Sequence, residues 1–329
     1  MKGVLYVLQE VLKDIYQIKV PLPNNPLRSI NSYLIKDRNR SLLIDTGFNL
    51  PQCKLALQRG IESLGLDWSK IDFFITHFHG DHYGLVEELA GEKSTIYFSE
   101  ADAKVVQGGR MAGYWERVFS FYRMHGYPQE YLEKQKKTLM NNFPFREMSY
   151  TCVKEGQIIR VGGYLLTCVS TPGHTPGHMC LYEPKHKFLI SGDHILADIT
   201  SNITARFDFH DSLGWYFMSL NKIDLLDIDI VLPGHRTIIN DCHTRISELV
   251  SHHKDRLNEI GMILRQGPMR GYQVASRMHW DMPYAAWDEV PIYQKWFATG
   301  EAIAHLENLA EQGIVQRIRR NEELAYTLI

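Results

Sequence analysis

The chain contains the stretch Thr76-His77-Phe78-His79-Gly80-Asp81-His82, which directly follows an apolar run and places three imidazoles and one carboxylate within six residues. A loop at the end of a buried strand can turn alternate side chains toward one cavity, so that His77 and His79 share one cation. Asp81 and His82 can then turn toward a second cation. A histidine-rich surface loop is the alternative, but this density of liganding residue types argues against it.

Three further strand-like runs end in glycine-containing turns, and each turn carries one candidate ligand. Two divalent ions held a few ångströms apart can share a hydroxide and clamp a substrate oxygen, as in hydrolytic two-metal centres. The turns are Thr171-Pro172-Gly173-His174-Thr175-Pro176-Gly177-His178, Ser191-Gly192-Asp193-His194 and Pro233-Gly234-His235.

With its motifs in this order, the chain resembles the metallo-β-lactamase-fold hydrolases, which carry an HxHxDH loop, a PGHT-type turn, a GD turn and a PGH turn. The resemblance implies an α/β fold, a four-layer αβ/βα sandwich with the metals at one sheet edge. It also implies two divalent metal ions. Zn²⁺ suits the imidazole-rich set, and Fe or Mn would also be accepted. By the resemblance, His77, His79 and His174 bind the first ion, Asp81, His82 and His235 bind the second, and Asp193 bridges both.

Asp45 follows the strand-like run 41–44 and precedes Thr46-Gly47, as in the first motif of the family. The resemblance implies that Asp45 lies outside the ligand shell and orients a liganding histidine by hydrogen bonding. Asp81 and Asp45 are therefore the candidate catalytic residues, although Asp45 also fits an ordinary Asp-Thr-Gly turn. The resemblance assigns no metal to His178 or His194, for which we expect hydrogen-bonded structural roles.

The ligand set predicts a metal-dependent hydrolase in which a metal-bridging hydroxide attacks an electrophilic centre. The turns most resemble the glyoxalase II group, so we expect a small-molecule thioester, ester or lactone as the substrate. Arg236 and a long aromatic insert depart from that group. The alternative is an endoribonuclease or phosphodiesterase of the β-lactamase-like branch. A metal-bound scaffold or sensor without enzymatic activity is a third interpretation.

The order of elements predicts sheets covered by helices, in a catalytic domain over residues 1–265. A segment at 100–150, rich in tyrosine and phenylalanine, is expected to form helices over the metal cleft. These aromatics could instead pack against the sandwich or a partner subunit. The expected strands are 5–8, 15–20, 32–35, 41–44, 73–76 and 95–98, followed by others near Ile158, Leu166, Leu181, Leu189 and Val231; the expected helices are 50–64, 83–89, 212–226 and 242–265.

Residues 266–329 are expected to form a winged-helix-like domain, with helices at 272–278, around Tyr293 and at 300–312, then a hairpin with strands at 315–318 and 324–328. The domain has six Lys or Arg and eight Asp or Glu, so its charge is 6 − 8 = −2. Nucleic-acid binding needs a basic surface, and only Arg317, Arg319 and Arg320 form a local basic group. We expect a packing, dimerisation or cleft-shaping role, with nucleic-acid binding kept as the alternative.

The composition is that of a chain with a substantial core, since 44% of its 329 residues are hydrophobic. No apolar run approaches the roughly 20 residues needed to span a bilayer, so we expect no membrane partner. The five cysteines are scattered and predict neither a disulfide framework nor a zinc ribbon. Gln9 and Glu10 interrupt the first apolar stretch, which favours a cytoplasmic location.

Overall fold

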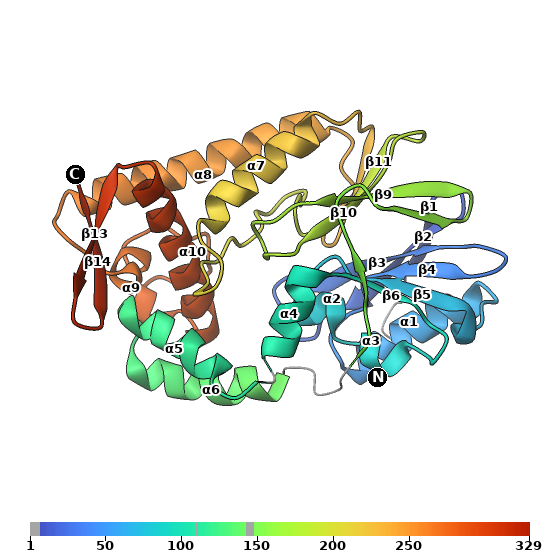
Figure 1. Ribbon diagram of the computed structural model, residues 1–329, viewed down its shortest axis with the longest axis horizontal. Helices are drawn as coiled ribbons and strands as arrows, with labels where there is room; N and C mark the ends of the chain where they lie inside the picture. Colours follow the sequence, from blue (N-terminus) through green and yellow to red (C-terminus); the bar gives the residue numbers. More distant parts are fainter. Residues whose placement is uncertain (1–6, 110, 143–147) are drawn as a thin grey trace.

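The computed structural model describes residues 7–109, 111–142 and 148–329, and two stacked β-sheets form one side of the molecule, on the right in Figure 1. Among the described residues, the first sheet has the order β1 (Val7–Leu12), β2 (Ile15–Pro21), β3 (Ser29–Ile35), β4 (Ser41–Ile44), β5 (Ile71–Phe74), β6 (Ile96–Ser99) and β7 (Thr151–Val153). The second has the order β12 (Ile230–Pro233), β11 (Phe188–Gly192), β10 (Met179–Glu183), β9 (Tyr164–Ser170) and β8 (Ile158–Val161). Pairing is antiparallel from β1 to β4, parallel from β4 to β7, and parallel again between β11 and β12. The strand expected at 5–8 lies partly outside the described residues and continues to Leu12.

The core between the sheets follows from the alternation of side chains along each strand. In β4, Leu42 and Ile44 point toward the second sheet and pack with residues such as Leu181 and Phe188. Leu43, between them, belongs to the core on the opposite face. Because successive side chains point to opposite faces, an entirely apolar strand needs cover on both sides.

Helices provide that outer cover on both sheets. Helix α1 (Pro51–Ser63) packs on the first sheet through Leu57 and Ile61. Helices α7 (Ser212–Asp224) and α8 (Cys242–Leu264) cover the second sheet through residues such as Leu220 and Leu249. The layers are therefore helix, sheet, sheet and helix, which is the αβ/βα sandwich expected from the motifs (Figure 1).

The single helix expected over 83–89 is wrong, because two short helices, α2 (Gly80–Tyr83) and α3 (Val86–Leu89), occupy this stretch. Gly84 separates them and lies tightly against the preceding loop, since a Cβ there would be 2.8 Å from the carbonyl oxygen of Gly47. The next amide, that of Leu85, donates to the hydroxyl of Thr46 at 3.2 Å. A side chain of the Asp45 loop thus replaces a helical hydrogen bond.

Segment 100–150 contains the helices α4 (Glu100–Gly108), α5 (Tyr114–Met124) and α6 (Gln129–Asn142), while residue 110 and residues 143–147 lie outside the described residues. Several of its aromatics form a core with the C-terminal region instead of lining the metal site. Tyr122 stacks on Trp296 with ring centroids 3.5 Å apart, and Phe119 and Tyr127 are buried beside it. This burial attaches α5 and α6 to the C-terminal region.

The C-terminal region contains α9 (Gly271–Ala275), α10 (Ile292–Glu311), and the hairpin β13 (Val315–Arg320) and β14 (Glu323–Leu328). The separate helices expected around Tyr293 and at 300–312 are one continuous helix. Gly300 lies inside it, where a Cβ would meet Cγ2 of Thr204 at 2.1 Å, so this glycine permits close approach and does not end the helix. The two-stranded sheet is present as expected, whereas the winged-helix classification stays a prediction.

None of the helices in the described part of the chain has the length and apolarity needed to cross a membrane.

Candidate metal centre

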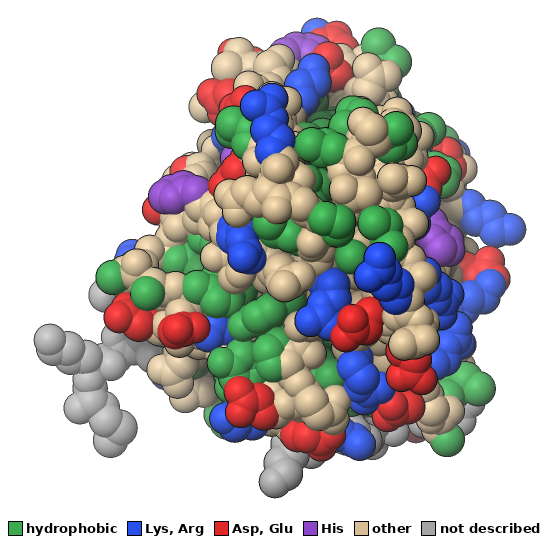
Figure 2. All heavy atoms as spheres, turned by 90° about the vertical axis from the view of Figure 1, so that its left-hand side faces the viewer, with side chains coloured by type: hydrophobic (Ala, Val, Ile, Leu, Met, Phe, Trp, Pro, Cys, Tyr) green, Lys and Arg blue, Asp and Glu red, His purple; other side chains and the backbone are tan. Residues whose placement is uncertain are grey.

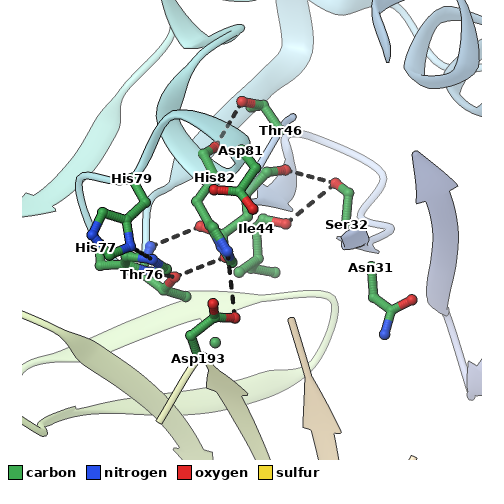
Figure 3. Close-up of polar contacts among 12 residues, drawn as sticks. Asn31, Ser32, Ile44, Thr46, Thr76, His77, His79, Asp81, His82 and Asp193 are labelled. Carbon is green, nitrogen blue, oxygen red and sulfur yellow. Dashed lines mark hydrogen bonds and ion pairs between the residues drawn. The ribbon is translucent and has the colours of Figure 1, made fainter. Parts of the chain in front are cut away.

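The candidate ligands lie at the carboxyl ends of strands from both sheets. Loops that follow β5, β9, β11 and β12 carry His77 to His82, His174, Asp193 and His235, respectively. Figure 3 shows Asp193, from the second sheet, facing His82 and Asp81 of the first. In open α/β sheets, ligands bind outside the carboxyl ends of strands, and here two sheets deliver side chains to one such edge.

Three ring nitrogens form the first group: Nε2 of His77, Nδ1 of His79 and Nε2 of His174. The His77 and His79 nitrogens are 3.0 Å apart, and the His174 nitrogen lies 3.2 Å from the first and 2.9 Å from the second. Tetrahedral zinc with Zn–N bonds of about 2.0–2.1 Å separates its nitrogens by about 3.3 Å. The triangle therefore has nearly the size of one face of a metal tetrahedron.

A second group consists of Asp81, His82 and His235. Nε2 of His82 lies 3.3 Å from Nε2 of His235, which in turn lies 3.4 Å from Oδ2 of Asp81. Within each group, the candidate donor atoms all lie within 4.8 Å of one another. These two groups match the sets that the resemblance implied, and His77, His82 and Asp193 form a third group that overlaps both.

Asp193 lies between the two groups. Its Oδ1 is 3.4 Å from Nε2 of His82, and its Oδ2 is 3.5 Å from Nε2 of His235 and 3.8 Å from Nε2 of His174. One carboxylate is thus within reach of donors from both sets. This position matches the bridging role that the resemblance implied for it.

Hydrogen bonds outside the cluster fix which ring nitrogen of four histidines faces inward. A backbone carbonyl can only accept, so a histidine nitrogen bonded to one carries a proton and its other nitrogen presents a lone pair. The outward contacts are His174 Nδ1 to the Asn202 carbonyl at 2.9 Å, His235 Nδ1 to the Ser29 carbonyl at 2.8 Å, His82 Nδ1 to Asp45 Oδ2 at 2.7 Å and His77 Nδ1 to Thr76 Oγ1 at 3.0 Å.

Asp45 is the outer partner of His82, which is the position expected for it. Its Oδ1 accepts from the Thr76 amide at 2.8 Å, and its Oδ2 accepts from the Thr76 hydroxyl at 2.8 Å. Because that hydroxyl donates to Asp45, its oxygen accepts from His77, and one carboxylate orients histidines of both groups. Asp45 has a φ of 58°, a left-handed conformation that is uncommon outside glycine and typical of functional sites.

The chemistry of the donor set fits divalent cations. Oδ1 of Asp193 is buried and has no hydrogen-bond partner among the described residues, although such an atom is costly to leave unpaired. Burial, together with His174, lowers the pKa of His79 to about 3, which keeps its imidazole neutral. Burial alone would raise the pKa of Asp81, but His235 and His82 hold it at about 2. Neutral imidazoles and ionised carboxylates are the forms that bind metal. Against the effect of burial, Asp193 raises the pKa of His82 and of His235, so a metal ion would have to displace a proton from these two rings.

Asp102 ties the two loops of the first group together, and the motifs gave no sign of it. This buried carboxylate on α4 accepts from the amide of Phe78 at 3.0 Å, the hydroxyl of Thr175 at 2.8 Å and the amide of Gly177 at 2.7 Å. Phe78 lies between two candidate ligands and Thr175 follows a third. Asp102 thus fixes the distance between the HxHxDH loop and the PGHT turn.

His178 and His194 lie beside the cluster without joining it. His178 bonds through Nδ1 to the Thr171 hydroxyl at 2.7 Å and through Nε2 to the Asp193 amide at 3.2 Å, as a structural residue would. His194 packs edge-on against Tyr216, and neither of its ring nitrogens has a hydrogen-bond partner within the described ranges. The expected hydrogen-bonded role therefore holds for His178 alone.

A cavity of about 660 Å³ lies on the α5 and α10 side of the centre, and none of the seven candidate ligands lines it. Its wall includes Phe121, Phe207 and Arg206. The Arg206 guanidinium lies 5.3 Å from the ring centroid of Phe78. The ring centroids of Phe78 and His79 are 4.8 Å apart. Phe78 and Arg206 therefore separate the cavity from the first group.

Sequence reasoning missed Thr76, Asp102, Asn202 and Arg206. Thr76 lies within the quoted motif and could have been noticed as a polar residue at the end of an apolar strand. Asp102 occupies the first turn of a helix, where acidic residues are common for electrostatic reasons, so its position gave no special signal. Asn202 acts on His174 through its backbone carbonyl, which no side-chain pattern reveals.

Comparisons with known proteins agree with this geometry. Residues 25–235 match the family profile described as the metallo-beta-lactamase superfamily. A Caenorhabditis elegans protein named beta-lactamase-like protein 2 homolog is 28% identical over 271 residues, which cover 80% of this chain and 77% of that protein. A probable metallo-hydrolase of Bacillus subtilis is 26% identical over 277 residues, covering 81% of this chain and 85% of its own.

A solved structure extends the similarity to nearly the whole chain. The crystal structure of a metallo-beta-lactamase family protein from Thermus thermophilus aligns with a TM-score of 0.83 and 26% identity, covering 97% of this chain and all of that one. A beta-lactamase domain protein from Burkholderia ambifaria aligns with a TM-score of 0.80 and 23% identity, over 98% of this chain and 95% of its own. The second likeness concerns the fold alone. Both alignments include the C-terminal region as well as the sandwich.

Proposed function

The chain belongs to the metallo-beta-lactamase superfamily, and on that premise we propose that it is a dinuclear, zinc-dependent hydrolase of small-molecule thioesters, esters or lactones. One observation carries the proposal. Inward-facing nitrogens of five histidines and oxygens of two aspartates meet in two overlapping groups, with Asp193 within reach of both. A structural role would not require so many lone pairs to converge on two points.

When bound, a pair of divalent cations supplies an activated water and polarises the substrate oxygen. The residues of this chain hold the arrangement in which that chemistry proceeds. Asp45 and Thr76 keep the rings of His82 and His77 in fixed orientations. The carboxylate of Asp81, with a pKa near 2, stays ionised at neutral pH, which is the form that would ligate a metal ion.

A cavity of small-molecule size lies beside the centre, behind Phe78 and Arg206. Its volume, about 660 Å³, falls within the roughly 300–1,000 Å³ typical of small-molecule sites. Phe121, Phe207 and Phe209 give it an apolar wall, while Arg117 lies over the ring of Phe207 at 4.4 Å. An acyl or aromatic group suits these rings, whereas Asp211 and Glu307 in the same wall oppose an anionic group.

Charges near the C-terminal hairpin argue against nucleic acid as the substrate. Arg317, part of the predicted basic group, pairs with Glu307 and with Glu311. On the face of the molecule shown in Figure 2, Lys and Arg side chains are intermixed with Asp and Glu. A nucleic-acid surface instead needs basic side chains free to contact successive phosphates.

The test combines metal analysis with a substrate panel. Chain purified and loaded with Zn²⁺ is analysed for metal content, then incubated with p-nitrophenyl esters of increasing acyl length, a thioester panel, lactones, bis-p-nitrophenyl phosphate and single-stranded RNA. We expect two metal ions per chain and turnover of esters or thioesters. Turnover of the phosphodiester or RNA without ester turnover would replace the proposal with the nuclease alternative.

A further inference from the structure

One connection runs from the candidate metal centre into the C-terminal helix. His174 donates its Nδ1 proton to the backbone carbonyl of Asn202 at 2.9 Å, and Ser201, the preceding residue, donates its hydroxyl to the carbonyl of Asp193. Residues 201–205 therefore form a loop, called here the bracing loop, which contacts a ligand of the first group and the residue between the groups. The position of this loop decides where the His174 ring points.

The bracing loop is held by the side chain of Asn202, whose amide has a defined orientation. Its Oδ1 accepts from the hydroxyl of Thr204 at 2.6 Å, so its Nδ2 must point the other way. That Nδ2 donates to Oε2 of Glu301 on α10 at 2.6 Å. The carboxylate can only accept, so flipping the amide would set Oδ1 of Asn202 against it and break this contact, although the Thr204 hydroxyl could accept from the flipped amide.

Glu301 is unusual in its surroundings, because it is only 8% exposed and lies among the buried residues of α10. Burial raises its pKa, while Arg256 and the Asn202 amide act in the opposite direction. A buried carboxylate is costly, and replacement by an apolar residue would often stabilise the fold. The contact with Asn202 is the hydrogen bond that this side chain makes in the described structure.

The backbone of the same helix holds the loop at a second point. The Ala205 amide donates to the carbonyl of Gly300 at 3.0 Å, and the absence of a side chain at Gly300 makes room for Thr204. The bracing loop thus docks on α10 through two successive residues of that helix. α10 in turn packs against α7 and α8 through Ile303 and Ala304.

We propose that Glu301 is a positioning residue for the metal centre, acting through Asn202 to set the orientation of His174. The inference rests on the proposed metal-dependent function, because it concerns the geometry of a ligand. It gives the C-terminal region a defined task, which is to supply an outer support for the first group. Outer partners of metal ligands typically contribute about 10–100-fold to metal affinity.

The experiment measures metal affinity directly. Chain stripped with a chelator is titrated with Zn²⁺ in competition with a chromophoric chelator, and separately with Co²⁺ while the visible absorption of the bound ion is recorded. Glu301→Ala should weaken binding at one of the two sites by about tenfold and change the Co²⁺ spectrum of that site. Glu301→Gln, whose amide oxygen can still accept from Asn202, should restore both. A purely structural role would lower the melting temperature without moving the spectrum.

Two further variants make the outcome decisive. Glu311→Ala removes a glutamate of the same helix that pairs with Arg317 and does not touch the bracing loop, so it should leave both affinities unchanged. Asn202→Ala cuts the same link from the loop side, and combining it with Glu301→Ala should add little to either single change. Should Glu301→Ala or Asn202→Ala fold and bind both ions as the unmodified chain does, with the same spectrum, the inference is wrong. If the unmodified chain itself binds no metal, the proposed function fails instead.

Discussion

Two groups of histidines in this molecule differ in how their ring nitrogens face one another. In the metal centre, nitrogens of His77, His79 and His174 converge within 2.9–3.2 Å of one another. In the C-terminal half, His253 and His305 form a chain: Nδ1 of His253 lies 3.1 Å from Nε2 of His305, whose Nδ1 lies 2.8 Å from the carbonyl of Glu301. Convergence leaves lone pairs facing each other, whereas the chain pairs one donor with one acceptor at each step.

The difference shows that burial and number do not make a metal site from histidines. Burial lowers the pKa of His305 to about 4, much as it lowers the pKa of His79, so both rings are neutral near pH 7. A backbone carbonyl accepts from Nδ1 in both groups, at His174 and at His305. What separates the groups is the partner of the other ring nitrogen. Nε2 of His174 faces Nε2 of His77, whereas Nε2 of His305 accepts from Nδ1 of His253.

The prediction with the largest expected effect replaces one histidine in each of the two groups. His79→Ala should remove metal from the first group and nearly all hydrolytic activity, by more than the ~100-fold that loss of an outer partner costs. The control change His253→Gln, in a fully buried ring outside the centre, should leave metal content and activity intact. Metal analysis and initial rates on a p-nitrophenyl ester measure both effects, and full activity with complete metal content in His79→Ala would rule out the ligand assignment.

A smaller effect is expected for Asp45, the carboxylate that accepts a hydrogen bond from His82 in the candidate metal centre. Asp45→Ala removes the acceptor for His82 and for the Thr76 hydroxyl, so metal affinity should fall about 10–100-fold. Competition with a chromophoric chelator gives this value. Asp72→Ala, which removes the ion-pair partner of Arg40 and the acceptor for the Thr95 amide, is the control; Asp72 contacts none of the candidate ligands, so the change should not alter affinity.

Asp102→Ala probes how firmly the two loops of the metal group are joined. The change leaves buried amides of Phe78 and Gly177 without an acceptor, at a cost of about 1–3 kcal/mol for each. We expect a lower free energy of unfolding in urea and weaker binding at the first group. Unchanged metal affinity in a destabilised variant would mean that Asp102 supports the fold without setting the ligand spacing.

The smallest expected effect concerns the pH dependence of the free energy of unfolding and His125, a histidine outside the candidate metal centre. Burial lowers the pKa of His125 to about 4, against the opposing charge of Glu307, so between pH 6.5 and 4 the unfolded chain takes up a proton there that the folded chain does not. Its contribution to stability is complete above pH 6.5 and is lost as the pH falls toward 4, at up to about 1.4 kcal/mol per pH unit. His125→Phe should flatten the decline by that amount in urea unfolding measured at pH 7.0 and 5.5. Equal slopes would show that the ring titrates normally.

The sandwich could be predicted because its motifs and apolar runs are local and resemble those of a known family, and the candidate ligands lie together as that resemblance implies, while their role in binding metal stays a prediction. Apolar runs such as Ser41–Ile44 have the length of strands, and polar turns follow them directly, so strand ends and ligands could be placed together. The supports of the ligands could not be predicted in the same way. The acceptors for His174 and His235 are backbone carbonyls, which every residue possesses.

Helix α10 shows why the sequence pattern gave the wrong helix boundaries in the C-terminal region. The sequence pattern predicts one helix around Tyr293 and another beginning at Gly300, whereas α10 is continuous through both. The structure uses the missing side chain of Gly300 for contact with Thr204, a residue far away in the sequence. The sequence alone does not distinguish a glycine that ends a helix from a glycine inside a helix that makes room for a packing partner, because the partner is distant in the sequence.

The docking of the bracing loop on α10 also determines when the centre can be completed during synthesis. Asn202 and Glu301 are 99 positions apart, so at about 5–20 residues per second a ribosome needs roughly 5–20 s to make the helix after it has made the loop. Both sheets and every candidate ligand precede α10 in the chain. A nascent chain therefore has its ligands several seconds before it has the helix that braces one of them.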